Sequence, residues 1–170
     1  MAANTRFINP EALHKPPAYT QVVEVTGPGR TIYISGQLGG GPDGRLVGSD
    51  FRSQAVQVFE NLMSALEGVG ASFKDVVKVN SYLADVNDLP VLREVRMGYL
   101  NAAALPASTT LGGLSFAREG ALLEVEVIAV LPVKGSSAKA QGTKRSAGKA
   151  QGKKWSAGKA KSKSRGRKGR

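Results

Sequence analysis

Apolar side chains return every three or four residues between positions 51 and 69, which is the spacing of one face of an α-helix. That face consists of Phe51, Ala55, Phe59, Leu62, Leu66 and Val69. Asp50 precedes it as a favourable N-cap, and Gly70 follows it as a favourable helix end. A shorter stripe opens after Asp88 and Pro90 and consists of Leu92, Val95 and Tyr99. The pattern therefore predicts two amphipathic helices.

Other stretches of the chain favour β-strands. Residues 21–36 are rich in β-branched and aromatic side chains and predict two short strands around a turn at 26–29. Residues 74–83 alternate between polar and apolar, residues 108–114 give a weaker strand signal, and residues 121–131 give the strongest one. The resulting order β-β-α-β-α-β-β predicts an α+β fold, in which a mixed sheet carries both helices on one face.

The last predicted strand places carboxylates on one of its two faces. Because side chains alternate along a strand, one face holds Leu122, Glu124, Glu126 and Ile128, and the other holds Leu123, Val125, Val127 and Ala129. The two carboxylates lie about 7 Å apart in the most apolar stretch of the chain. Burying an unpaired carboxylate is costly. Two interpretations follow: an edge strand whose carboxylates face solvent, or a functional site.

Charge divides the chain into two parts. The 170 residues include 24 Lys+Arg and 13 Asp+Glu. Residues 134–170 hold 14 of these cations and no acid, so residues 1–133 hold 10 cations and 13 acids. A mildly acidic domain at 1–133 is thus followed by a polycationic tail at 134–170. This division excludes a uniformly basic nucleic-acid-binding domain.

The tail is built from a lysine-rich decapeptide repeat. Residues 139–148 and 149–158 are identical at eight of ten positions, and a third copy decays after residue 159. Low hydrophobicity with dense like charge predicts disorder. The expected partner is nucleic acid or another polyanion, bound without sequence preference, although a solvated extension with little function is the plain alternative. The candidate polyanion-binding residues are Lys144, Arg145, Lys153, Lys154, Lys161, Lys163, Arg165 and Arg167.

Composition also bears on the kind of chemistry. Cysteine is absent, which excludes disulfides, thiolate zinc sites and cysteine nucleophiles. His14 is the only histidine, which argues against an imidazole-rich metal site or a serine–histidine relay. No apolar run approaches the ~20 residues that span a bilayer, and the N-terminus lacks the apolar region of a signal peptide. We therefore expect a soluble, cytoplasmic protein.

Two further features lie outside the apolar pattern. Residues 35–37, Ser-Gly-Gln, end a predicted strand where glycines begin, so a hydroxyl and backbone N–H groups there are able to bind an anion or a carbonyl. An ordinary turn is the alternative. Arg93 and Arg96 project from the polar side of the second predicted helix, where a solvated face is the ordinary interpretation.

Five segments in collinear order carry a resemblance to a known family. They are AYTQ at 18–21, YISGQ at 33–37, the stretch from Asp50 to Leu89, LPAS at 105–108 and LEVEVIAV at 123–130. Over about residues 17–132 the chain resembles the RidA/YjgF/UK114 family, the reactive-intermediate deaminases. The resemblance implies a chorismate-mutase-like fold and a homotrimer with a small-molecule site in each cleft between subunits. It covers none of the tail.

In its best-studied branch, the family hydrolyses 2-imino or enamino acids to 2-keto acids and ammonia without a cofactor. An arginine clamps the substrate carboxylate, and a glutamate in the last strand orients the attacking water. The resemblance places that glutamate at Glu124 and other pocket residues at Tyr19, Ser35, Arg93 and Thr110. The clamping arginine falls on Ser108, which is the main departure from the family pattern.

Serine offers one neutral hydrogen bond where a guanidinium offers a charged fork. Three interpretations follow. Ser108 lines a neutral pocket for a carboxylate-free imine, enamine or related carbonyl compound, which we place first. Alternatively, Arg93 or Arg96 replaces the lost cation and the substrate remains acidic. In the third interpretation the trimer is a noncatalytic ligand-binding module, tethered to polyanions by its tail.

Overall fold

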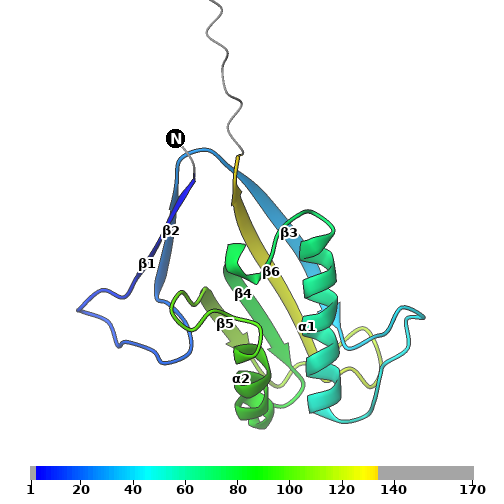
Figure 1. Cartoon of the computed structure of the whole chain (residues 1–170). Coiled ribbons are helices and arrows are strands. Elements are labelled where there is room, and N and C mark those ends of the chain that lie inside the picture. Colours follow the sequence, from blue (N-terminus) through cyan, green and yellow to red (C-terminus); the bar gives the residue numbers. More distant parts are fainter. Residues whose placement is uncertain (1–2, 134–170) are drawn as a thin grey trace, which may run out of the picture. The chain divides into compact units, whose positions relative to one another are not determined.

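The computed structural model describes residues 3–133 (Figure 1). The elements in chain order are β1 (Asn4–Ile8), β2 (Val22–Thr26), β3 (Gly29–Leu38), α1 (Phe51–Glu67), β4 (Val76–Leu83), α2 (Leu89–Met97), β5 (Ala107–Leu111) and β6 (Leu123–Pro132). The decapeptide tail, with the eight cations named above, lies outside the described residues. In the described part, no helix is long and apolar enough to cross a membrane.

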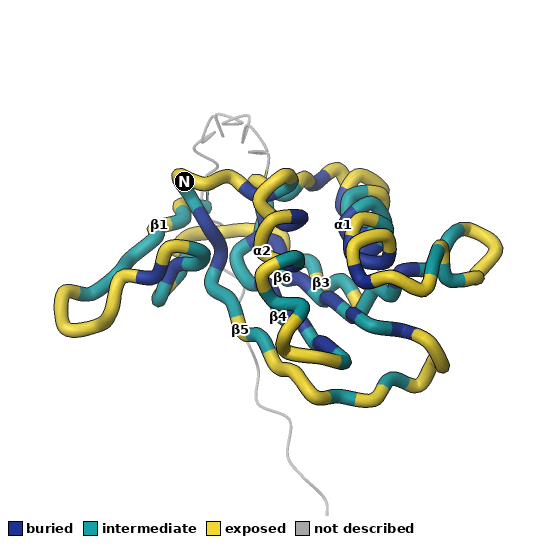
Figure 2. The backbone as a smooth tube through the Cα atoms, turned by 90° about the horizontal axis from the view of Figure 1, so that it is seen from below, coloured by how far each residue is buried: buried dark blue, intermediate teal, exposed yellow. Residues whose placement is uncertain are grey.

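Four strands form the main sheet, in the order β3-β6-β4-β5. The pair β4–β5 is parallel, and the other neighbours are antiparallel. Figures 1 and 2 show α1 and α2 on the same side of this sheet. The predicted α+β class, the mixed sheet and the two helices are therefore confirmed.

The first two predicted strands do not form a hairpin with each other. β2 pairs with a strand that the pattern missed, β1, in a separate two-stranded ribbon, whereas β3 pairs with β6. Gly27, with φ +82°, turns the chain from the ribbon into the sheet. The five residues of β1 are three polar side chains followed by two apolar ones, so they show no alternation. The ribbon continues into the segment of residues 9–21, which becomes part of the site.

The first helix begins where its sequence predicts. Asp50 has extended backbone, and its side chain accepts a hydrogen bond from the N–H of Ser53 at 2.9 Å. The helix ends at Glu67, earlier than the apolar stripe suggested. Gly70, at φ +73°, then reverses the chain toward β4.

The alternation predicted for the last strand is confirmed by burial. Leu123, Val125, Val127 and Ala129 are buried in the core beneath the helices. However, β6 lies between β3 and β4, so the edge-strand interpretation of its carboxylates is wrong. Glu124 and Glu126 instead lie on the sheet face that neither α1 nor α2 covers, which is called the uncovered face below (Figure 2).

Candidate functional site

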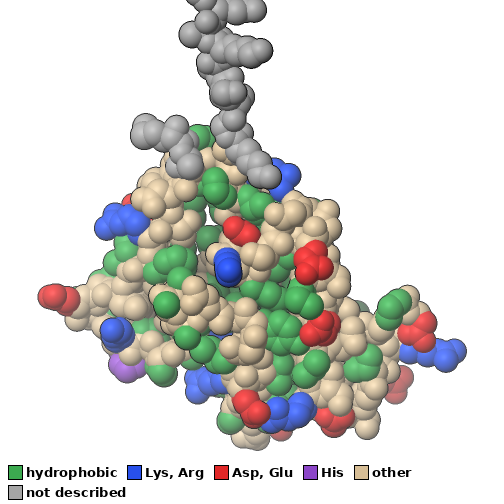
Figure 3. Space-filling view, viewed as in Figure 1, with side chains coloured by type: hydrophobic (Ala, Val, Ile, Leu, Met, Phe, Trp, Pro, Cys, Tyr) green, Lys and Arg blue, Asp and Glu red, His purple; other side chains and the backbone are tan. Residues whose placement is uncertain are grey.

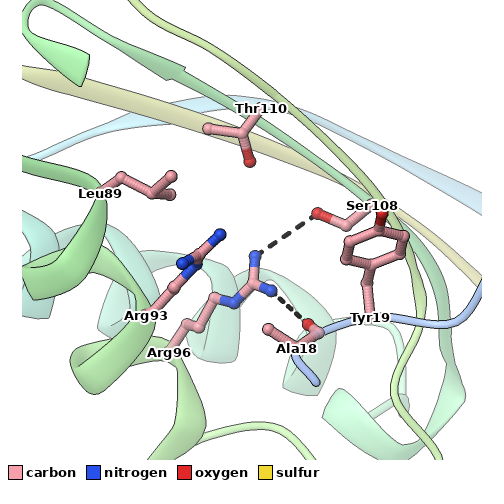
Figure 4. A pocket seen from close by; sticks show the side chains of 7 residues that line it. All are labelled: Ala18, Tyr19, Leu89, Arg93, Arg96, Ser108 and Thr110. Carbon is pink, nitrogen blue, oxygen red and sulfur yellow. Dashed lines mark hydrogen bonds between the residues drawn. The ribbon is translucent and has the colours of Figure 1, made fainter. Parts of the chain in front are cut away.

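A cavity of about 270 Å³ lies between α2, β5 and the segment that leads into β2. Its lining residues are Ala18, Tyr19, Leu89, Arg93, Arg96, Ser108 and Thr110 (Figure 4). The lining therefore contains two guanidinium groups, three hydroxyl groups and no carboxylate. Such a lining favours an anion.

Arg96 is the central feature of this cavity, with only 3% of its surface exposed. Its Nη1 donates a long hydrogen bond of 3.4 Å to the Oγ of Ser108, and its Nη2 donates to the carbonyl of Ala18 (Figure 4). Its Nε is buried and has no partner within residues 3–133. Burial, and then the nearby charge of Arg93, lower the pKa of Arg96. A buried cation without a counter-ion is costly to hold, and an anion in the cavity would relieve that cost.

Residues from a distant part of the chain enclose Arg96. The Thr20 N–H donates to the carbonyl of Pro106 at 3.1 Å, and the Thr20 hydroxyl donates to the carbonyl of Leu105 at 2.6 Å. These bonds fix the segment before β2 against the entry to β5. Ala18, 78 residues from Arg96 in sequence, can therefore accept from its guanidinium.

The pairing of β4 with β5 aims two of the three hydroxyl side chains of β5 at the same cavity. Ser108 pairs with Val79, and Thr110 pairs with Ser81. Val79 and Ser81 are buried on the helix-covered face. Ser108 and Thr110 therefore share that face, and Figure 4 shows both of them beside the guanidinium groups of α2.

The cavity brings together most of the pocket residues that the family resemblance implies. It contains Tyr19, Arg93, Ser108 and Thr110. It does not contain Ser35 or Glu124, which lie on the uncovered face of the sheet. One copy of the chain therefore holds two separate parts of the predicted site.

The solvated-face interpretation of the two arginines is wrong for Arg96. Arg93 is exposed at the cavity, as expected, but Arg96 is buried in it. The sequence did hold a signal, because residues three apart lie on one side of a helix and Arg93 was already a candidate. A guanidinium group therefore lies beside Ser108, the position of the family's clamping arginine, but it belongs to Arg96 of α2.

Glu124 lies against a glycine in a bulge of β3. The pairing of β3 with β6 shifts register between Ile34 and Gln37, so Ser35 and Gly36 form the irregularity inside the strand and are not a turn after it. A Cβ at Gly36 would lie 1.8 Å from Oε1 of Glu124. The missing side chain of Gly36 thus makes room for the Glu124 carboxylate beside Ser35.

The second carboxylate on this face has a different environment. Oε1 of Glu126 accepts hydrogen bonds from Asn80 Nδ2 at 2.8 Å and from the Tyr82 hydroxyl at 3.0 Å. The bond to Glu126 raises the pKa of Tyr82. By contrast, no hydrogen bond holds the Glu124 carboxylate within the part of the chain that the structure describes. Asn80 and Tyr82 therefore hold the Glu126 carboxylate in place, while the Glu124 carboxylate is available to a ligand or a water.

In residues 3–133, no group of three or more His, Cys, Asp or Glu side chains is arranged to hold a metal ion.

The fold and the cavity together define a small α+β protein with a cavity lined by two guanidinium groups. Residues 11–131 match the model of the family described as Endoribonuclease L-PSP. The chain belongs to this family, the RidA/YjgF family, and the resemblance seen in the sequence is confirmed.

Curated relatives carry the name of a deaminase. A 2-iminobutanoate/2-iminopropanoate deaminase of Dermatophagoides farinae is 34% identical over 114 residues, covering 66% of this chain and 85% of that protein. A protein of the same name from Mus musculus is 39% identical over 113 residues, covering 66% of this chain and 80% of that protein.

Solved structures of the family share the fold. A Rid-family protein of unknown function from Yersinia pestis has a TM-score of 0.69 at 32% identity, covering 75% of this chain and 99% of that one. RidA from an Antarctic Psychrobacter has a TM-score of 0.56 at 34% identity, covering 72% of this chain and all of that one. These similarities support a family-level comparison of the site.

Proposed function

We propose that the protein is a hydrolytic deaminase of acidic imines and enamines, converting a 2-imino acid to the 2-keto acid and ammonia. The observation that carries this proposal is the buried guanidinium of Arg96 beside Ser108. Ser108 alone favoured a carboxylate-free substrate, and Arg96 reverses that preference. The deaminases named above, at 34–39% identity, support the reaction type.

The reaction needs a bound carboxylate and a positioned water. Arg96 binds the substrate carboxylate through charged hydrogen bonds, and the hydroxyl groups of Ser108 and Thr110 line the same wall. Water adds to the carbon of the protonated C=N bond and gives up a proton to Glu124. That proton passes to the nitrogen of the resulting carbinolamine, which leaves Glu124 ionised again. The C–N bond then breaks and ammonia leaves, while Glu124 takes the hydroxyl proton as the C=O bond forms and afterwards returns it to the solvent or to the ammonia. An iminium is already electrophilic, so positioning and proton transfer supply the catalysis.

Glu124 reaches the substrate from a second copy of the chain in this proposal. Within one copy, Glu124 and Ser35 lie on the uncovered face of the sheet, opposite the cavity that contains Arg96. A homotrimer of the kind expected from the sequence would bring the uncovered face of one subunit to the cavity of the next. The active site would then be shared between subunits.

The proposal is tested by ammonia release from freshly generated 2-iminopropanoate and, in parallel, from a carboxylate-free imine of similar size. We expect the full chain to accelerate hydrolysis of the acidic imine and to act weakly on the neutral one. The heat-unfolded chain serves as the control. Hydrolysis no faster than this control would contradict deamination, while a preference for the neutral imine would restore the interpretation based on Ser108.

Replacing Gly36 with alanine should lower kcat by about ten- to a hundredfold, because a displaced catalytic group costs rate steeply. The three atoms nearest to the new Cβ all belong to the flexible side chain of Glu124, so the side chain should move and the fold should tolerate the change. Gly40→Ala is the matched control, since its Cβ would lie 3.6 Å from the nearest atom. Steady-state kinetics and thermal unfolding of both variants provide the measurement. A Gly36→Ala protein with the kcat of Gly40→Ala would show that the position of Glu124 is unimportant.

We also propose that the tail binds polyanions, on the basis of its 14 cations and absence of acids. The face of the folded part seen in Figure 3 carries scattered charges of both signs and no extended basic patch. The full chain should retain DNA or RNA weakly at ~50 mM salt and release it by ~300 mM, because binding of this kind depends on counterion release. A gel shift should show no retention by a chain ending at Pro132. Equal retention by both chains would assign any binding to the folded part.

A further inference from the structure

Two cations from one helix point into the same cavity, and neither has an acidic partner within the described residues. Figure 4 shows the guanidinium groups of Arg93 and Arg96 converging between Leu89 and Ser108. The ion pairs in residues 3–133 are Arg6–Glu24, Arg45–Asp43 and Arg52–Glu94. The acid next to Arg93 on α2, Glu94, is thus held away by two hydrogen bonds of 2.9 and 2.6 Å from Arg52.

The two cations occupy different depths. Arg96 is buried, and its Nε has no hydrogen-bond partner within residues 3–133. Arg93 is exposed at the cavity, where a second anionic group would remain partly hydrated. Burial, and then the nearby charge of Arg93, lower the pKa of Arg96, so both make its charged form more costly.

A single carboxylate neutralises only one of these charges. With a carboxylate on Arg96, the charge of Arg93 remains uncompensated beside an apolar wall formed by Leu89. A second carboxylate on the same ligand would neutralise it without a further loss of translational freedom. The cavity of about 270 Å³ suits a compact ligand of four or five carbons.

We propose that the site selects dicarboxylic 2-imino or 2-enamino acids over monocarboxylic ones, with Arg96 binding the carboxylate next to the imine and Arg93 binding the distal carboxylate. This inference rests on the proposed function, because it assumes that the ligand is an imine that the site hydrolyses. The preference for two carboxylates concerns binding alone and can be tested without hydrolysis. Oxidation of the amine of an acidic amino acid is the class of reaction that supplies such an imine.

The inference is tested by calorimetric titration of the full chain with two stable 2-keto acids of equal carbon number. 2-Oxoglutarate carries the second carboxylate, and 2-oxopentanoate lacks it. We expect the wild type to bind 2-oxoglutarate about tenfold more tightly. Arg93→Gln should bring the two affinities within about twofold of each other, and Arg96→Met should weaken both. Arg45→Gln, at an exposed position outside the cavity, should keep the wild-type preference.

Equal affinity of the wild type for the two acids, a preference that survives Arg93→Gln, or no binding of either acid would overturn the inference. Hydrolysis of the corresponding imines is measured separately. If the binding preference is present and neither imine is hydrolysed, the proposed reaction fails and the selectivity stands. If both imines are hydrolysed equally well and the keto acids bind equally, the reaction stands and the selectivity fails.

Discussion

Replacing Arg96 with methionine is expected to lower kcat/KM for an acidic 2-imino acid by about a hundred- to a thousandfold, because two charged hydrogen bonds to the carboxylate are lost. The folded state should remain as stable or become more stable. Methionine fills the space of the arginine stem, and exchanging a buried, unpaired charge for an apolar side chain is commonly neutral or stabilising. Steady-state kinetics with 2-iminopropanoate and denaturant unfolding of the same preparations provide the two measurements.

A matched pair of variants separates loss of the cation from a packing defect. Adding Ser108→Arg to Arg96→Met returns a guanidinium to the cavity from β5 and should recover at least about tenfold in kcat/KM over Arg96→Met alone. Arg45→Met, an exposed arginine elsewhere, should retain wild-type kinetics. An Arg96→Met protein with unchanged kcat/KM would remove Arg96 from substrate binding.

Replacing Glu124 with glutamine is expected to lower kcat by about a hundred- to ten-thousandfold while KM changes little. Glutamine keeps the shape of the side chain but cannot take a proton from water, and the binding cation is untouched. Glu126→Gln is the matched control on the same face. It alters a carboxylate already held by Asn80 and Tyr82, so its effect should fall on stability more than on turnover. Wild-type kcat in Glu124→Gln would exclude it as the base.

A shared active site makes a further prediction for these two variants. Arg96→Met and Glu124→Gln chains should each be nearly inactive alone. If they are unfolded, mixed and refolded together, a fraction of the sites should combine an intact Arg96 with an intact Glu124 from a different chain. Activity well above that of either variant is therefore expected, whereas a mixture no more active than its parts would place both groups in one subunit.

The local pattern predicted the elements better than it predicted their neighbours. The period of α1 and the alternation of β6 follow from which side chains face the core, and both appear in the structure. That β6 lies in the middle of the sheet depends on pairing with β3 and β4, and nothing local to residues 121–131 encodes this. For the same reason the sequence pattern predicts that β2 pairs with β3 across the turn at 26–29, whereas in the structure β2 pairs with β1.

The site shows the same division between local and distant information. Tyr19, Ser108 and Thr110 could be named from the family resemblance, and the cavity contains all three. The burial of Arg96 could not be predicted from α2 alone. It depends on Thr20, which holds the segment containing Ala18 in place through hydrogen bonds to Leu105 and Pro106. A helical wheel of α2 places Arg96 on the polar side of the helix and so predicts that it is exposed, whereas the structure buries it.

The proposed arrangement has Arg96 bound to the carboxylate of an imine substrate, in a site completed by Glu124 of a second copy. A crystal structure of the full chain with 2-oxobutanoate, the keto-acid product of 2-iminobutanoate hydrolysis, tests it most directly. We expect the ligand carboxylate within ~3 Å of the Arg96 guanidinium nitrogens, and the Glu124 carboxylate of a neighbouring subunit within one water of the ligand carbonyl carbon. A ligand bound elsewhere, with Arg96 still bonded to Ser108 and Ala18, would show that Arg96 does not bind the substrate carboxylate.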